Sequence, residues 1–140
     1  VRCRGAMKTD AAPQPVGAYV HCRREGDMLF LSGVGSRLPD GSGIAGGATE
    51  DADGNPQEYD VVAQTEQVIA NVRAILEAAG SSLDRVVDVT VFLTNMRRDF
   101  PDFNATWARH FEDLGVARTT VEVGALPTPI AVEFKVVARA

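Results

Sequence analysis

The sequence predicts an α+β fold, a two-layer sandwich in which two helices cover one face of a five- to six-stranded mixed sheet. Two long segments repeat their apolar residues at helical spacing, and five or six shorter segments have the composition of strands. The chain has 140 residues, 45% hydrophobic and 24% charged, which is enough for one globular domain with its own core.

The chain begins with twelve small or charged residues that show no periodicity. We expect residues 1–12 to be a flexible N-terminal segment and residues 13–140 to form the single domain. Met7 is a candidate for the native start, which would make residues 1–6 an upstream extension.

Two short strands and a long loop are predicted next. The strands cover residues 19–22 and 28–32, with a turn over 23–27. Residues 36–59 are rich in Gly, Asp and Pro, and we expect a loop with at most one short strand near 43–45. A loop of this length inside a compact domain is often functional. Its Asp-Gly clusters lack the ligand spacing of a calcium-binding EF-hand.

Two helices are expected in the second half of the chain. The first covers residues 61–79, with Asp60 as its N-cap and Gly80 just after its last turn. The second covers residues 98–114, with Asp99 as its N-cap. Its apolar stripe is mostly aromatic: Phe100, Phe103, Trp107, Phe111 and Leu114.

Three further strands complete the sheet, over residues 86–94, 118–123 and 130–138. In the first of them Val87, Val89, Val91 and Leu93 alternate onto one face. Both helices must cover one face of the sheet, and no element remains to cover the other. That second face still carries apolar residues such as Phe92 and Val137, which predicts oligomerisation through the sheet.

Composition excludes several classes of function. The net charge is -5, where a nucleic-acid-binding protein normally has a basic balance. No apolar run approaches the length of a membrane span. Two cysteines and two histidines make neither a disulfide framework nor a zinc pattern, which fits a cytoplasmic location. Phosphate-binding, dinucleotide and nucleophile-elbow motifs are absent, so we expect no metal, cofactor, nucleic acid or membrane partner.

Arg118 and Glu133 are the candidates for chemistry on pattern alone. Arg118 opens a strand, and its guanidinium is suited to binding a carboxylate; a solvated surface ion pair is the simpler interpretation. Glu133 interrupts an apolar strand and could serve as a general base that holds a water molecule. An ion pair with Lys135 or a neighbouring strand is the simpler interpretation there. For His21, a structural histidine with satisfied hydrogen bonds is the default.

Several blocks in the right order resemble one known family. They are Val16-Gly17-Ala18-Tyr19, Leu31-Ser32-Gly33, Gln64-Thr65 with Ile69 and Asn71, Phe103-Asn104, Ala117-Arg118-Thr119-Thr120-Val121, Leu126-Pro127 and Val132-Glu133. This pattern resembles the Rid family of enamine/imine deaminases (YjgF-type proteins). Within the family it is most similar to the bacterial 2-aminomuconate deaminases, on Ser32-Gly33 with Ser36-Arg37, Pro39-Asp40, Asn95-Met96 and Leu126-Pro127.

The resemblance implies a chorismate-mutase-like fold and a homotrimer with active sites between subunits. It implies that Arg118 binds the substrate carboxylate and that Glu133 positions the hydrolytic water. Tyr19 and the backbone of Gly33 would line the site, and Asn104 would support it.

One residue departs from the family pattern. Many members carry cysteine two residues after the arginine, where this chain has Thr120. The family uses the backbone at this position to contact the substrate, so hydrolysis is compatible with Thr120, whereas thiol chemistry is not.

The resemblance therefore implies a hydrolase acting on C–N bonds. The expected reaction is deamination of 2-aminomuconate to 4-oxalocrotonate and ammonia in aromatic-compound catabolism. This substrate has a second carboxylate, for which Arg37 and His21 are candidates. The alternatives are a generalist enamine/imine deaminase acting on 2-aminoacrylate-type intermediates and a non-catalytic trimer that binds small ligands.

Overall fold

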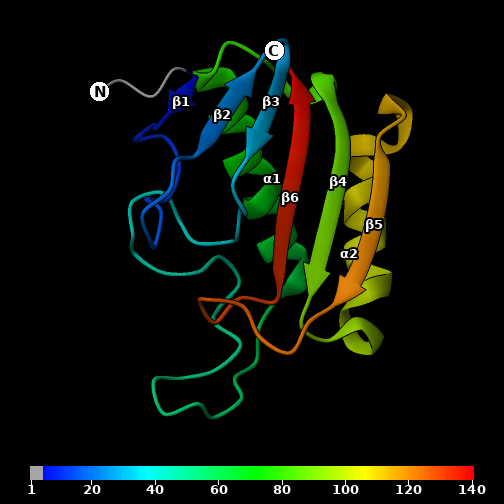
Figure 1. Cartoon of the computed structure of the whole chain (residues 1–140). Helices are drawn as coiled ribbons and strands as arrows, with labels where there is room; N and C mark the ends of the chain where they lie inside the picture. The colour runs from blue at the N-terminus through cyan, green and yellow to red at the C-terminus, as the bar shows by residue number, and fades with distance from the viewer. Residues whose placement is uncertain (1–4) are drawn as a thin grey trace.

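The computed structural model describes residues 5–140 and contains one six-stranded sheet with two helices on one face (Figure 1). The helices are α1 (Val61–Ala78) and α2 (Met96–Phe111), with short 3-10 turns at Leu83–Arg85 and Glu112–Leu114. The strands are β1 (Ala6–Met7), β2 (Cys22–Glu25), β3 (Met28–Leu31), β4 (Val86–Leu93), β5 (Ala117–Glu122) and β6 (Val132–Arg139). They lie in the order β1-β2-β3-β6-β4-β5.

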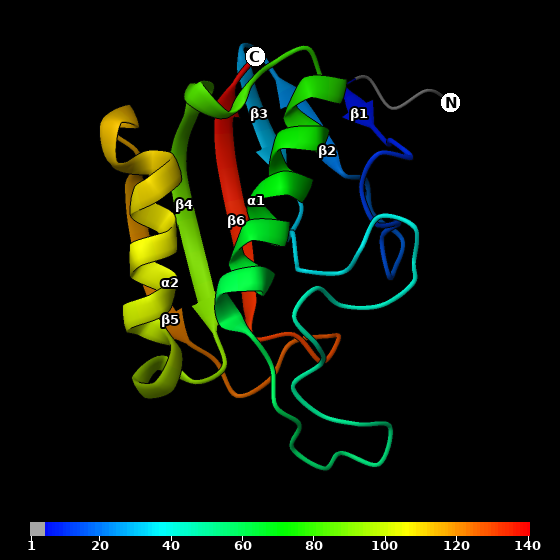
Figure 2. The ribbon, with the colours of Figure 1, turned by 180° about the vertical axis from the view of Figure 1, so that it is seen from behind.

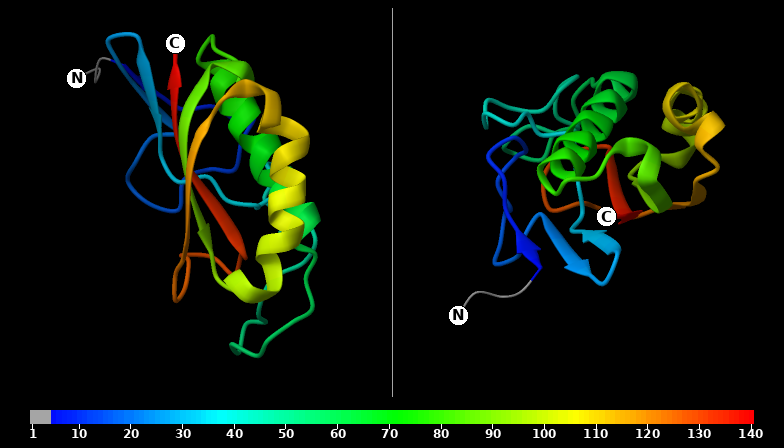
Figure 3. Two further views of the ribbon diagram at one scale, coloured as in Figure 1. Left: turned by 90° about the vertical axis from the view of Figure 1, so that its right-hand side faces the viewer. Right: turned by 90° about the horizontal axis from the view of Figure 1, so that it is seen from above.

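The sheet is mixed, because β4 and β5 run parallel and the other neighbouring pairs are antiparallel. Both helices pack on the same side of it (Figures 2 and 3). These features confirm the predicted fold class. Phe103 of α2 lies at the centre of the core, with its ring edge-on to Phe134 of β6 at 6.2 Å between centroids.

The opposite face of the sheet has no covering layer within residues 5–140 (Figure 3). It carries apolar side chains, and Phe30 and Val121 are 41% and 37% exposed. Phe92 and Val137 of the central strands are half-buried on the same face. The predicted open face with apolar side chains is therefore present, and exposed apolar faces of this kind are typical of surfaces that another protein chain covers.

The ends of α1 are those that the sequence predicted. The Asp60 carboxylate accepts hydrogen bonds from the backbone N–H groups of Val62 and Ala63. At the other end Gly80 takes φ +81°, a conformation that favours glycine, and its N–H bonds to the Glu77 carbonyl. The helix is thus closed at both ends by local contacts.

The predicted N-cap of α2 is wrong. The helix begins at Met96, and Asn95 is the cap, accepting a hydrogen bond from the Arg98 N–H at 3.0 Å. Glu122 of β5 accepts a bond from the Met96 N–H at 2.9 Å, which satisfies another free donor of the first turn. Asp99 instead lies buried in that turn and accepts a 2.6 Å hydrogen bond from the Tyr59 hydroxyl.

Two strand predictions need correction. The strand predicted over 19–22 begins at Cys22 and continues to Glu25, because the turn is confined to Gly26 and Asp27. Its polar residues therefore lie on an exposed strand rather than in a loop. In β4 a bulge between Val86 and Asp88 turns Val87 outward, so this valine is 40% exposed rather than in the core.

The loop predicted over residues 36–59 is present between β3 and α1, and it extends beyond the end of the sheet (Figures 1 and 2). The short strand considered at 43–45 is absent; Ile44 forms only an isolated bridge with Arg37.

The segment that precedes β2 contains an unexpected edge strand. Ala6 and Met7 of β1 pair with Arg23 and Cys22, and Ala12 is fully buried. Backbone pairing and core packing therefore begin before residue 13. A two-residue strand is too short to leave a periodic signal, so it could not be predicted. The part of the N-terminal prediction that concerns residues 1–4 lies outside the described residues.

Replacing the N-cap of α1 tests the account of this helix. Asp60→Ala removes the acceptor for two backbone N–H groups and should lower the free energy of unfolding by about 1 kcal/mol. Asp60→Asn is the matched control, because it removes the charge and keeps the acceptor, and should cost much less. Urea denaturation of the three proteins measures the difference; equal losses in both variants would contradict the capping role.

Candidate active site

Arg118 lies on β5 and points toward α2. It pairs with Val89 of β4, a buried residue beneath the helices, so the two side chains share the helix-covered face. Its guanidinium carbon lies 5.0 Å from the Trp107 ring centroid and 5.2 Å from that of Phe103. Burial lowers the pKa of the Arg118 guanidinium from its ordinary value. The side chain is therefore only partly in solvent, and aromatic rings flank its charge.

Asn104 of α2 accepts a hydrogen bond at Oδ1 from Nη2 of Arg118, at 2.8 Å. It is the one hydrogen-bond partner of this guanidinium among the described residues. The simpler interpretation of Arg118, a surface ion pair, does not hold in the described residues, where no carboxylate lies within 4.0 Å of it. Its remaining N–H donors are available for an acceptor that this chain does not supply.

Glu133 lies on β6 and points to the opposite, open face. Its neighbours Val132 and Phe134 are buried beneath the helices, and strand alternation directs Glu133 the other way. The carboxylate contacts Gly33 so closely that a Cβ added there would lie 2.9 Å from Oε2. A side chain at position 33 would therefore require the carboxylate to move.

The Glu133 carboxylate forms no ion pair within residues 5–140. Lys135, its expected partner, donates instead to the Leu31 carbonyl. Burial raises the pKa of the Glu133 carboxyl above its ordinary value of 4.5. A half-buried carboxyl group with a raised pKa and no cation beside it is a candidate general base.

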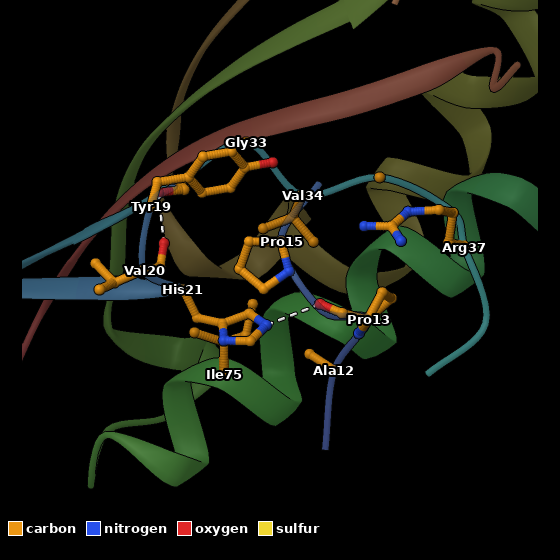
Figure 4. A pocket seen from close by; sticks show the side chains of 12 residues that line it. Ala12, Pro13, Pro15, Tyr19, Val20, His21, Gly33, Val34, Arg37 and Ile75 are labelled. Atoms are coloured by element: carbon orange, nitrogen blue, oxygen red, sulfur yellow. Dashed lines mark hydrogen bonds between the residues drawn. The ribbon is translucent and has the colours of Figure 1, made fainter. Parts of the chain in front are cut away.

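A small pocket lies between residues 12–21 and 32–37, and Ile75 of α1 also lines it (Figure 4). Tyr19, Gly33 and Arg37 are among the residues that line it. The Tyr19 hydroxyl accepts a hydrogen bond from the Val16 N–H at 3.2 Å. Gly33 lines this pocket and also lies against the Glu133 carboxylate, so the pocket and the carboxylate meet at the same glycine.

His21 lines the same pocket, and Figure 4 shows its bond to Pro13. Both of its ring nitrogens are already bonded. Nδ1 accepts from the Thr9 N–H at 3.2 Å, so Nε2 carries the proton that bonds to the Pro13 carbonyl at 2.8 Å. The side chain is only 5% exposed. These contacts are those of a structural histidine that holds the N-terminal segment, and they leave no nitrogen for a substrate carboxylate.

Two buried polar residues of α1 hold the loop that carries Arg37. Asn71 donates from Nδ2 to the carbonyls of Gly35 and Arg37, both at 2.9 Å. Gln64 accepts from the Ser36 hydroxyl at 2.9 Å and from the Ala131 N–H at 2.8 Å. Their roles were not predicted, although polar residues on the apolar side of a predicted helix are a signal for such contacts.

Thr120 lies two residues after Arg118 on the same face of β5. Its hydroxyl is buried and has no hydrogen-bond partner within the described part of the chain. The side-chain oxygen is therefore turned away from solvent. Because β5 is the last strand of the sheet, one side of its backbone is unpaired, and the main chain at Thr120 lies on that edge strand.

Arg118 and Glu133 thus lie on opposite faces of the sheet. Asn104 and Thr120 lie near Arg118 at the β5 edge, whereas Tyr19 and Arg37 line the pocket that also contains Gly33. β4 lies between β5 and β6. A single chain therefore does not bring Arg118 and Glu133 together.

This arrangement defines a class: a small α+β sandwich with an arginine suited to a carboxylate ligand and a carboxyl group suited to acid–base chemistry. Within residues 5–140, no three histidine, cysteine, aspartate or glutamate side chains gather closely enough to hold a metal ion. Neither described helix is both long and apolar enough to cross a membrane.

Comparison with known proteins identifies the family. The family model described as Endoribonuclease L-PSP matches residues 9–140, and the chain belongs to this family, the Rid or YjgF-type proteins. A RutC family protein of Pyrococcus horikoshii is 37% identical over 130 residues, 93% of each chain. Reactive Intermediate Deaminase A of Arabidopsis thaliana is 31% identical over 132 residues, 94% of this chain and 64% of that protein. The crystal structure of RidA from a Psychrobacter species is 32% identical, with a TM-score of 0.80 over 98% of this chain and 100% of the other.

The raised pKa of Glu133 predicts a pH-dependent stability difference. A carboxyl group whose pKa is higher in the folded state costs no stability while it is protonated in both states. Folding is penalised once the pH rises above 4.5, because the unfolded chain ionises more readily. The free energy of unfolding of Glu133→Gln, relative to that of the wild type, should therefore increase from about pH 4 to about pH 7. Urea denaturation at both pH values measures this, and a gain that shrinks with rising pH would contradict it.

Proposed function

We propose that this protein hydrolyses enamine or imine carboxylates to 2-oxo acids and ammonia. The observation that carries this proposal is the Glu133 carboxyl group, half-buried beside Gly33 and without an ion-pair partner in the described chain. Such a group can hold a water molecule and accept its proton. The relative named Reactive Intermediate Deaminase A supports the same class of reaction.

The proposed mechanism uses no group beyond this protein and water. The enamine tautomerises to an imine, and Arg118 binds its carboxylate through paired N–H donors. Water attacks the carbon of the protonated imine while Glu133 takes one of the water protons, which gives a neutral tetrahedral carbinolamine. Glu133 returns this proton to the nitrogen, and the C–N bond then breaks as the hydroxyl group gives its proton to Glu133 and the C=O bond forms. Ammonia leaves and takes this last proton as ammonium. Imine hydrolysis is intrinsically easy, so positioning and proton transfer are sufficient.

The proposed site needs more than one copy of the chain. Arg118 and Glu133 face opposite sides of the sheet, and the open side is apolar around Phe30, Phe92 and Val137. We propose a homotrimer in which the open faces pack together and Arg118 of one copy meets Glu133 of its neighbour. A guanidinium brought near Glu133 would offset part of the effect of burial on the pKa of its carboxyl group, so the stability gain of Glu133→Gln would be smaller in the assembly than in a single chain.

The narrower proposal is that 2-aminomuconate is the substrate, within aromatic-compound catabolism. Arg37 is the observation that favours it, since it lines the pocket beside Gly33 and offers a second cation for a second carboxylate. Its Nη2 already donates to the Gln14 carbonyl at 2.8 Å, which holds the side chain in place. A generalist that acts on 2-aminoacrylate would not need this cation.

Two other functions receive less support. A non-catalytic ligand-binding trimer would use Arg118 but gives no role to the unpaired Glu133 carboxyl. The family description names an endoribonuclease, but the net charge of -5 disfavours binding to a polyanion such as RNA.

Substitution of the two central residues tests the deaminase proposal. Glu133→Gln should lower kcat about a hundredfold to ten-thousandfold, the usual effect of a lost general base. Arg118→Ala should mainly raise KM, because it removes the carboxylate contact. The assay follows ammonia release from 2-aminoacrylate generated in situ, with Arg139→Ala as an exposed arginine control. A wild-type rate no faster than spontaneous hydrolysis would refute the proposal.

Arg37→Ala tests the narrower substrate. Loss of the second cation should reduce the ratio of kcat/KM for 2-aminomuconate to kcat/KM for 2-aminoacrylate about tenfold, equivalent to about 1.4 kcal/mol of transition-state binding. Arg37→Lys, which keeps a charge, should reduce the ratio less. An unchanged ratio in Arg37→Ala would show that this residue does not bind the second carboxylate.

A further inference from the structure

We propose that Asn104 is a positioning residue that orients the Arg118 guanidinium for a carboxylate ligand without neutralising its charge. This inference rests on the proposed function, since it concerns the same carboxylate-binding group. Asn104 acts through Arg118 rather than on the substrate.

The first observation is the surroundings of the guanidinium. Phe100, Phe103 and Trp107 of α2 lie 5.0 to 5.8 Å from its central carbon, measured to their ring centroids. Aromatic rings attract the positive charge but do not provide the directional acceptors that a guanidinium plane needs. The Asn104 oxygen, 2.8 Å from Nη2, therefore determines which way the plane faces.

The second observation is the type of residue at position 104. An aspartate or glutamate there would bind Arg118 more strongly, but it would cancel the charge and compete with the ligand carboxylate. An amide oxygen uses one donor nitrogen and leaves the positive charge in place. Of the five N–H donors of arginine, those not directed at Asn104 stay available for a second, charged acceptor.

The third observation is that Asn104 contributes little else to the fold. It is exposed on α2, where asparagine is a poorer helix former than alanine. Its neighbours Phe103 and Trp107 are buried and support the core. Helix stability therefore gives no reason for asparagine at this position, whereas orientation of Arg118 does.

Asn104→Asp is the decisive variant, because it keeps the size of the side chain and the helix propensity while adding a competing carboxylate. Two probes are compared by calorimetry, 2-oxobutyrate and its uncharged amide. The affinity for 2-oxobutyrate should fall about tenfold in Asn104→Asp, and the affinity for the amide should change less than about twofold. In the deaminase assay the variant should raise KM with little change in kcat.

Two further variants complete the test. Asn104→Ala removes the acceptor without adding charge and should weaken 2-oxobutyrate binding to an intermediate degree. Ala105→Asp adds the same charge at the next exposed position of α2 and should behave like the wild type. Equal losses for both probes in Asn104→Asp would indicate general structural damage and overturn the positioning role.

Failure of this inference is distinguishable from failure of the proposed function. A wild-type protein that deaminates, with Asn104→Asp indistinguishable from it in KM and in 2-oxobutyrate binding, overturns the role of Asn104 alone. A wild-type protein that binds 2-oxobutyrate but does not accelerate deamination overturns the proposed function. In that case the binding comparison still decides the role of Asn104.

Discussion

Strand alternation is the constraint on which the candidate site depends. Each side chain of a strand points to one face of the sheet or the other, and the burial of Val89 beneath α2 places its partner Arg118 on the helix side. The burial of Val132 and Phe134 likewise places Glu133 on the open side. The core therefore separates the two groups that the proposed reaction needs, and a neighbouring copy of the chain is the simplest way to reunite them.

The same core also prepares each group for chemistry. Phe103 and Trp107 of α2 pack against Phe134 of β6, and the same two rings flank the Arg118 guanidinium. On the other side Gly33 allows the chain after β3 to approach Glu133 closely and shields the carboxyl group. Half-buried charges without ion-pair partners are costly to stability. A functional role therefore explains the presence of one on each face of the sheet better than a stabilising role does.

Much of the fold could be predicted from periodicity, and the errors have physical causes. The spacing of apolar residues located α1 and the strand that carries Arg118. It does not reveal a bulge such as the one in β4 that directs Val87 to the outside. Asp99 is of a residue type that often caps helices. Asn95 is the N-cap instead, because Glu122 of β5 supplies a further acceptor to the first turn that follows Asn95. Such contacts join distant parts of the chain and leave no local signal.

The residues of the candidate site could be singled out from the sequence, but the contacts around them could not. Arg118 was selected because it opens a strand, and Glu133 because it interrupts an apolar one. The aromatic residues around Arg118 were interpreted as core alone, since a helical stripe does not show which charged group from another strand lies against it. For His21, the bonds to Thr9 and Pro13 depend on how the N-terminal segment folds back. Substrate choice depends on few lining residues, so family similarity does not determine it.

The most direct test of a site shared between copies is to mix two impaired variants, with the substrate held well below the raised KM of the arginine variant. Arg118→Ala and Glu133→Gln are produced separately and together, and deamination is measured after assembly. In a randomly mixed homotrimer about a quarter of the sites combine an intact Arg118 with an intact Glu133 from the neighbour, so about a quarter of the wild-type activity should return. Activity no greater than that of the separate variants, in a preparation proven to contain mixed assemblies, would contradict the shared site.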